Sequence, residues 1–145
     1  MTGLAQRINI ITLGVADVAA ATAFYERLGW RKSGASQPDI TFMRLGNLVL
    51  SLFSREALAH DANLTLPEAS AFNGMTLAIN LPSEAEVDAA MDHAAAAGAK
   101  ILKSPQKVFW GGYSGYFADP DGHAFELAYN PFFPLDENGL IVLPD

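Results

Sequence analysis

An internal repeat constrains the fold of this 145-residue chain more than any other feature. Two amphipathic segments begin near Asp17 and Glu86 and end at Gly29 and Gly98, so that both pairs are 69 residues apart. Apolar residues recur at helical spacing in each segment, and strand-like apolar runs lie before and after it in the same order. The sequence therefore predicts one domain built from two copies of the same unit.

The first copy has the signals of one helix and four strands. Asp17 suits the N-cap of the helix, and Gly29 suits its end. Gly46 and Asn47 form the predicted turn between the last two strands. The expected strands cover residues 8–15, 30–34, 40–45 and 48–53, and the helix covers 17–28.

The second copy repeats this order. Pro82 and Ser83 open its helix, and Glu84 and Glu86 favour the first turn. The run Asp119 to Gly122 has the residues of a type I turn. The expected strands cover residues 75–81, 99–103, 113–118 and 123–129, and this copy is longer by seven residues around 109–112.

These elements predict an α+β fold of two βαβββ modules, whose sheets curl against each other into a cup. The length of the chain suits a single domain spanning residues 1–145. We expect module one at 7–54, a linker with at most one helical turn at 55–73, module two at 74–131 and a C-terminal tail at 132–145.

Composition narrows the class of function. Half of the residues are hydrophobic, enough for a core, and the net charge of −7 argues against a nucleic-acid partner. The absence of cysteine excludes disulfides and thiolate chemistry and fits a cytoplasmic protein. We expect no membrane partner, since no apolar run is long enough to span a bilayer, and the N-terminus does not look like a signal peptide.

Two stretches resemble the glyoxalase/bleomycin resistance protein/extradiol dioxygenase superfamily, also called the vicinal oxygen chelate superfamily. They are residues 12–18 leading into PheTyrGluArgLeuGlyTrp at 24–30, and the AspProAspGly turn at 119–122 followed by a strand that carries Glu126. The resemblance covers the chain except for the linker and the last dozen residues. It implies the paired-module fold but no particular substrate.

The resemblance also implies where a metal would bind, because relatives take His, Gln or Glu ligands from the first and last strands of each module. Here the corresponding positions are Ile10, Leu50, Ile79 and Glu126, with Leu50 found by aligning Gly46 on Gly122, and Ile79 by the helix offset. Only Glu126 has a side chain that can bind a metal. None of the three histidines is placed to act as a ligand instead of Ile10, Leu50 or Ile79. We therefore expect no metal and no other cofactor, with a divalent metal at Glu126 as the alternative.

A small-molecule ligand is the expected partner. Glu126, on the wall of an apolar cup, is the candidate catalytic acid or base. The alternative is that Glu126 has no function and its carboxylate is only hydrogen-bonded to nearby polar groups. Trp110, Tyr113 and Tyr116 are predicted to cover the cup as an aromatic lid, with ordinary packing as the alternative. The predicted ligand-binding set is Trp110, Tyr113, Glu126, Ile10, Leu50, Ile79 and Phe53.

Three functions fit these observations. The first is metal-free binding of a small, preferably cationic, organic molecule. The second is a metal-dependent lyase, isomerase or dioxygenase of the superfamily. The third is a structural or interaction domain. The apolar tail is expected to pack on the sheet or on a second subunit, and the resemblance makes a homodimer the default assembly.

Overall fold

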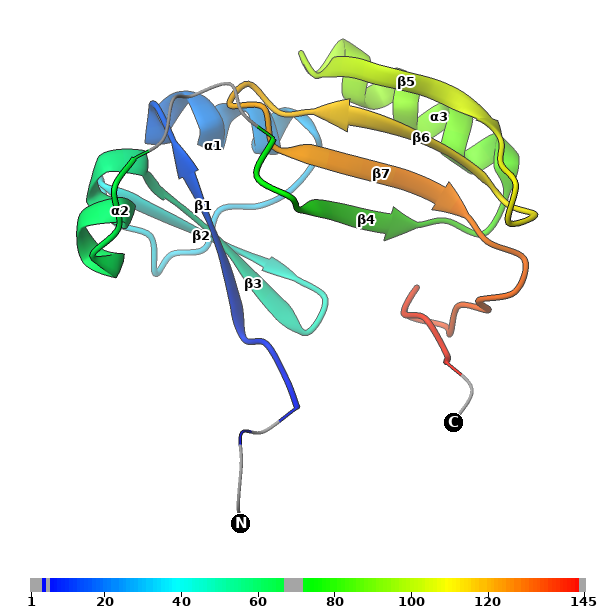
Figure 1. Cartoon of the computed structure of the whole chain (residues 1–145), viewed down its shortest axis with the longest axis horizontal. Coiled ribbons are helices and arrows are strands. Elements are labelled where there is room, and N and C mark those ends of the chain that lie inside the picture. The colour runs from blue at the N-terminus through cyan, green and yellow to red at the C-terminus, as the bar shows by residue number, and fades with distance from the viewer. Residues whose placement is uncertain (1–3, 5, 67–71, 144–145) are drawn as a thin grey trace. The chain divides into compact units, whose positions relative to one another are not determined.

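The computed structural model describes residue 4, residues 6–66 and residues 72–143 (Figure 1). The chain divides into two compact units, Met1–Pro67 and Glu68–Asp145, and each is described by itself. The division falls inside the segment 55–73 that the sequence predicts as a linker. Two mixed sheets with helices confirm the predicted α+β fold class.

The first unit contains a three-stranded sheet, here called sheet A, in the order β1-β3-β2. Strand β1 lies parallel to β3, and β2 lies antiparallel to it. The elements are β1 (Ile10–Val15), α1 (Val18–Arg27), β2 (Ile40–Leu45), β3 (Leu48–Ser54) and α2 (Arg55–Ala62).

Helix α1 forms where the sequence predicts it. The Asp17 side chain accepts a hydrogen bond from the Ala20 N–H at 3.0 Å, and Gly29 follows the helix with a positive φ of 104°. Phe24 and Tyr25 are fully buried on one side of the helix. On the same side, the hydroxyls of Thr22 and Thr41 lie 2.8 Å apart, which identifies the face of sheet A that packs against α1.

Two predictions for the first unit are wrong in extent. The predicted strand at 30–34 is reduced to a single bridge between Lys32 and Met43. The Phe42 carbonyl still accepts from the Ser33 N–H at 2.7 Å, but the Phe42 N–H donates to the Ser36 hydroxyl at 2.9 Å and not to a backbone carbonyl, so the ladder stops. The predicted linker begins with the eight-residue helix α2, whose N-cap, Ser54, accepts a hydrogen bond from the Ala57 N–H. No side chain of α2 is buried. The rest of the linker includes residues 67–71, which lie outside the described residues.

The second unit contains a four-stranded sheet, here called sheet B, in the order β4-β7-β6-β5. Strand β4 is parallel to β7, and the other two pairs are antiparallel. The elements are β4 (Thr76–Asn80), α3 (Glu84–Ala96), β5 (Lys100–Lys107), β6 (Tyr113–Ala118) and β7 (Ala124–Tyr129). Strand β5 is longer than predicted and passes Pro105 through a register shift, which an edge strand tolerates.

Helix α3 and the predicted turn are confirmed. The Ser83 hydroxyl caps the helix by accepting a hydrogen bond from the Glu86 N–H at 3.2 Å, and it donates to the Glu86 carboxylate at 3.0 Å. Phe117 and Phe125 stack at 5.2 Å in the core of this unit. In the turn, the Gly122 N–H donates to the Asp119 carbonyl at 3.0 Å.

The two units have the same strand arrangement, since β1-β3-β2 corresponds to β4-β7-β6. The sequence offset between them is not constant, however. The N-caps Asp17 and Ser83 are 66 residues apart, whereas Gly29 and Gly98 are 69 apart. Helix α1 has 10 residues and α3 has 13. These three extra residues, nearly one helical turn, account for the difference between the two offsets.

The tail after β7 folds into a loop rather than an element. A bridge joins Leu135 to Ile141, and the Asp136 side chain accepts hydrogen bonds from the N–H groups of Asn138 and Leu140. Several apolar side chains of this loop stay exposed, among them Phe132, Val142 and Leu143. Among the described residues, no helix is long and apolar enough to cross a membrane.

Candidate functional site

The two faces of sheet B are distinguished by Gly115. A Cβ placed on Gly115 would lie 2.9 Å from the Met91 Cε of α3, so Gly115 points at that helix. By strand alternation, Phe117, Phe125 and Leu127 share this face. The opposite side, here called the α3-distal face, carries Tyr116 and Glu126.

Glu126 stands in a row of side chains that crosses all four strands of sheet B. It pairs with Ala78 of β4 on one side and Tyr116 of β6 on the other, and Tyr116 pairs with Lys103 of β5. The Tyr116 hydroxyl lies near enough to the Glu126 carboxylate for that charge to raise the pKa of Tyr116. Glu126 is half-buried, and Lys103 is exposed.

The electrostatics of this pair favour a protonated tyrosine. Burial is the largest cause that raises the pKa of the Tyr116 hydroxyl above its ordinary value, and the charge and hydrogen bond of Glu126 raise it further. The hydroxyl therefore serves as a hydrogen-bond donor throughout the neutral pH range. Small side chains surround the pair on the same face: Ala78, Ser114, Ala118, Ala124 and Ala128.

Tyr113 does not lie on this face. It is three residues from Tyr116, so it points to the α3 side, where its hydroxyl donates to the Asp88 carboxylate at 2.7 Å. This hydrogen bond is the largest cause that raises the pKa of Tyr113. The prediction that Tyr113 covers the ligand side of the sheet is therefore not supported by its position.

Trp110 lies at the tip of the β5–β6 hairpin. The tip is closed by two backbone hydrogen bonds between Val108 and the residues Gly111 and Gly112, both 3.0 Å long. The Trp110 ring lies directly on Gly112, where an added Cβ would overlap its Cζ3 atom. The contacts that place Trp110 are thus within its own turn.

The predicted register is wrong for Leu50 and Ile79. Leu50 is 1% exposed and pairs with Met43, on the face of sheet A that packs against α1. Ile79 pairs with Leu127 on the α3 side of sheet B. The predicted alignment fails because the Gly46 turn has two residues between its strands, whereas the Asp119–Gly122 turn has five.

The strand pairs give a different counterpart for Glu126 in the first unit. The row Ala78–Glu126–Tyr116 corresponds to Thr12–Ser51–Phe42, which preserves both the sheet faces and the 66-residue offset of the N-caps. Ser51 is 1% exposed, and its hydroxyl has no hydrogen-bond partner among the described residues. Sequence spacing alone could not identify Ser51 as the counterpart of Glu126, because Gly46 and Gly122 do not occupy equivalent positions in their turns.

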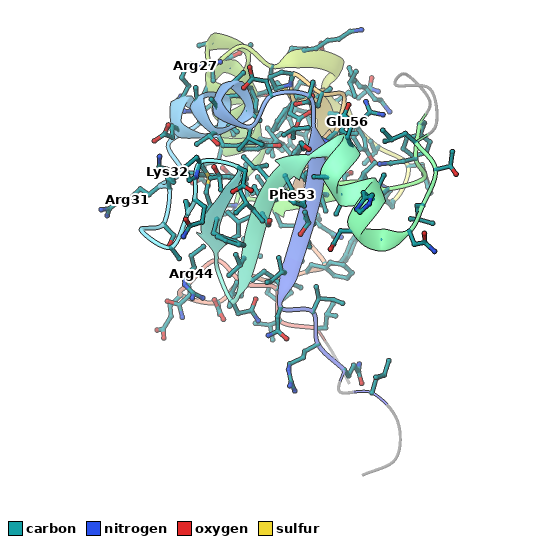
Figure 2. The ribbon with its side chains drawn as sticks, turned by 90° about the vertical axis from the view of Figure 1, so that its left-hand side faces the viewer. Arg27, Arg31, Lys32, Arg44, Phe53 and Glu56 are labelled. Carbon is teal, nitrogen blue, oxygen red and sulfur yellow. The ribbon has the colours of Figure 1, made fainter. Side chains whose placement is uncertain are left out.

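Ile10 and Phe53 lie on the side of sheet A away from α1, here called the α1-distal face. Ile10 is 51% exposed at one end of this face. Phe53 is half-buried on β3, next to the start of α2 (Figure 2). Both residues belong to the first unit and are not placed relative to Glu126.

The residues around Glu126 do not fit the multi-ligand metal site that the superfamily implies. Its neighbours on the α3-distal face are mostly alanines, together with Tyr116. Within residues 4, 6–66 and 72–143, no three His, Asp or Glu side chains converge. Of the histidines, His60 lies on α2, His93 on α3, and His123 in the turn before β7.

A groove that the sequence did not predict lies where the tail meets the ends of β4 and β7. Its volume is about 550 Å³. Its walls combine apolar side chains of both strand ends with the tail loop: Leu81, Pro82, Tyr129, Phe133, Leu135 and Glu137 among others. The Asp136 carboxylate at its edge is engaged by backbone N–H groups of the loop.

Comparisons with known proteins agree with this architecture. A glyoxalase-related enzyme from Fulvimarina pelagi matches with 34% identity and a TM-score of 0.87, over 97% of this chain and 100% of that chain. A lactoylglutathione lyase from Agrobacterium tumefaciens matches with 26% identity and a TM-score of 0.64, over 87% and 95% of the two chains. A glyoxalase/bleomycin resistance protein/dioxygenase family enzyme from Burkholderia phytofirmans PsJN has 20% identity and a TM-score of 0.74, over 83% and 96%, and shows the fold alone.

No curated protein matches the chain. Residues 7–127 match the family description Glyoxalase/Bleomycin resistance protein/Dioxygenase superfamily. This range includes both sheets almost entirely and ends just after Glu126. With the repeated units, the shared strand order and the match over most of its length, the chain belongs to the Glyoxalase/Bleomycin resistance protein/Dioxygenase superfamily.

Proposed function

We propose that the protein binds a small organic molecule on the α3-distal face of sheet B, without a catalytic metal. Glu126 and Tyr116 are the polar anchor of this site, and the surrounding alanines leave room for the ligand. The observation that carries the proposal is the Glu126 carboxylate beside the Tyr116 hydroxyl, on a face made of small side chains. A few directed polar groups within an apolar surface are typical of small-molecule sites.

The charge of the second unit favours a ligand with a cationic or hydrogen-bond-donating group. Residues 68–145 contain eleven Asp and Glu against three Lys. The Glu126 carboxylate has lone pairs that can accept hydrogen bonds from a ligand donor. An ammonium or amide N–H placed against Glu126 would complete the carboxylate's hydrogen bonds.

A thermal-shift screen of cationic and aromatic compounds, run with and without chelator, tests the proposal. We expect stabilisation by at least one compound that is insensitive to the chelator. Glu126→Gln should weaken that compound's affinity about tenfold or more, since hydrogen bonds to charged groups contribute about 1.5–3 kcal/mol. Asp92→Asn, which removes an exposed carboxylate on α3, is the matched control and should bind normally.

A spectrophotometric titration of the tyrosines reads the same pair independently. Because the Glu126 charge raises the pKa of Tyr116, Glu126→Gln should lower that pKa toward the ordinary value, while burial keeps it raised. The raised folded-state pKa means that this tyrosine contributes stability at neutral pH, which is lost as the pH rises above about 10. An unchanged titration in the variant would remove Glu126 from contact with Tyr116.

Other outcomes of the screen identify the alternatives. A stoichiometric divalent metal found by elemental analysis, with turnover that the chelator abolishes, would replace our proposal with a metal-dependent lyase or dioxygenase. The similarity to a lactoylglutathione lyase makes that comparison necessary. A protein that neither metals nor compounds stabilise would be a structural or interaction domain.

We also propose that the protein is a homodimer and that it is cytoplasmic. The support for the dimer is the exposed apolar tail, and the support for the location is the absence of cysteine from the sequence.

A further inference from the structure

Three cationic side chains lie along one edge of sheet A. Arg44 is on β2, and Arg31 and Lys32 are on the segment that bridges to it (Figure 2). All three are exposed. None of these three side chains forms a hydrogen bond or an ion pair within the described part of the chain, where a salt bridge joins Lys107 to Glu84.

The bridge places two of these charges directly opposite each other. Lys32 pairs with Met43 in antiparallel register, so Arg31 stands opposite Arg44. Met43 faces α1 and is fully buried; by alternation, Arg31 and Arg44 both point to the α1-distal face. Like charges opposite each other across strands are destabilising. An arrangement that costs stability without a partner indicates that a partner of opposite charge binds there.

The charge of the first unit permits such a partner. Residues 1–67 contain six basic and five acidic residues, whereas the rest of the chain is strongly acidic. An anion would be repelled by the second unit and is attracted to this edge of the first. The arginine pair also has the geometry that suits oxyanions, because guanidinium groups donate two parallel hydrogen bonds to a carboxylate or a phosphate.

A second observation on the same face points to a ligand. Ser51 stands two residues along β3 from Val49, the strand partner of Arg44, and its buried hydroxyl has no partner among the described residues. Buried polar groups are nearly always hydrogen-bonded, so an unpaired one needs an explanation. On this face Val49 lies beside Arg44, and Phe42 lies beside Ser51.

The geometry points to a binding site for a small organic anion on the α1-distal face of sheet A. Its carboxylate or phosphate sits on Arg31 and Arg44, whereas Lys32, paired with the α1-facing Met43, points to the other face. Its apolar body lies over Val49 and Phe42. A polar atom at the far end of the ligand reaches the Ser51 hydroxyl when the Phe42 ring moves aside, about 6.8 Å along the strand from the arginine row. The site does not depend on Glu126.

Anion titrations of the purified chain at matched ionic strength test this site, with melting temperature and calorimetry as the readouts. The probes are inorganic phosphate, acetate, benzoate and 4-hydroxybenzoate. We expect the aromatic carboxylates to stabilise the protein more than acetate, with 4-hydroxybenzoate binding about fivefold more tightly than benzoate. Stabilisation by phosphate alone would assign the site to a phosphorylated ligand instead of a carboxylate.

Matched variants separate the arginine pair from general charge effects. Arg31→Gln with Arg44→Gln should melt higher than the wild type without anion, because the repulsion is removed, and should bind the carboxylates at least tenfold more weakly. Arg7→Gln with Arg55→Gln changes the net charge equally and should keep the response. Ser51→Ala should bind 4-hydroxybenzoate as weakly as benzoate; an unchanged affinity would remove Ser51 from the site.

Two results would overturn the inference. One is a wild-type protein that responds to none of the anions beyond the effect of ionic strength. The other is an equal response in the Arg31/Arg44 variant. Glu126→Gln should respond like the wild type, so failure of this site and failure of the Glu126 site are distinguishable.

Discussion

The side of the sheet that a side chain faces determines its role in this chain. Tyr113 and Tyr116 are only three positions apart. The Tyr113 hydroxyl donates to Asp88 of α3, whereas Tyr116 lies beside Glu126 on the opposite face. Leu50 and Ser51 are adjacent, and the first is core beneath α1 while the second is an unpaired hydroxyl on the α1-distal face. A slip of one residue exchanges these roles.

Gly115 on β6 lies close to the backbone of the neighbouring strand β5 and to Met91 of α3. A Cβ there would lie 2.7 Å from the Lys103 carbonyl oxygen and 2.9 Å from the Pro105 nitrogen, and backbone atoms cannot move aside. We expect Gly115→Ala to lower the free energy of unfolding by about 1–3 kcal/mol in urea denaturation. Gly34→Ala, where a Cβ meets nothing within 4 Å, is the control and should cost little. Equal effects of the two changes would contradict the close approach.

At the scale of elements, the two serine-capped helices differ in how strongly they are held. Ser83 begins α3, which buries Val87, Met91 and Ala94 against sheet B. Ser54 begins α2, which buries no side chain and touches β1 through Arg55 and Leu58 near Gly14. The two helices therefore have similar N-caps but different surroundings: α3 packs against a core, and α2 lies on the surface.

The difference predicts unequal effects of the same substitution. Ser83→Ala should lower the global free energy of unfolding by about 1 kcal/mol, because α3 unfolds only with its core. Ser54→Ala should speed amide hydrogen exchange within α2, with little change in global stability. Ser83→Thr keeps the hydroxyl and serves as the control. A global loss in Ser54→Ala as large as that in Ser83→Ala would show that α2 is part of the cooperative core.

The whole molecule combines two similar units of unlike charge. The first unit has nearly balanced charge, and the second carries eight more acidic than basic residues. The candidate sites follow this division, with the arginine edge in the first unit and Glu126 in the second. The exposed apolar tail belongs to the acidic unit, where charge repulsion opposes self-association unless apolar burial outweighs it.

The proposed homodimer can be tested through the tail. Phe132 is 68% and Val142 51% exposed. If they are buried in a dimer, Phe132→Ser with Val142→Ser should shift the protein from dimer to monomer in light-scattering chromatography at micromolar concentration. Leu64→Ser, at a 69% exposed position of the first unit, is the control and should leave the mass unchanged. A monomeric wild type would disprove the dimer.

Elements and turns of this chain could be predicted from its sequence because their causes are local. Asp17 and Ser83 cap helices through their own side chains, and the Asp119–Gly122 turn closes through its own backbone. The short helix α2 was readable in principle, since Ser54 followed by Glu56 is a helix-start signal. The position of Glu126 on β7 likewise came from strand pattern and turn alone.

The amino-acid sequence by itself determined the repeated units, the helix ends and the superfamily resemblance, because these depend on neighbours within a few residues. The tertiary structure decided which side of each strand faces a helix, since strand pairing sets that side and turns of two and five residues shift the pairing differently. In the structure, Leu50, Ile79 and Tyr113 therefore lie on the helix-facing sides of their sheets and not on the side predicted to bind the ligand. It also placed Tyr116 beside Glu126 and Arg31 opposite Arg44, although the two residues of each pair are distant in the chain.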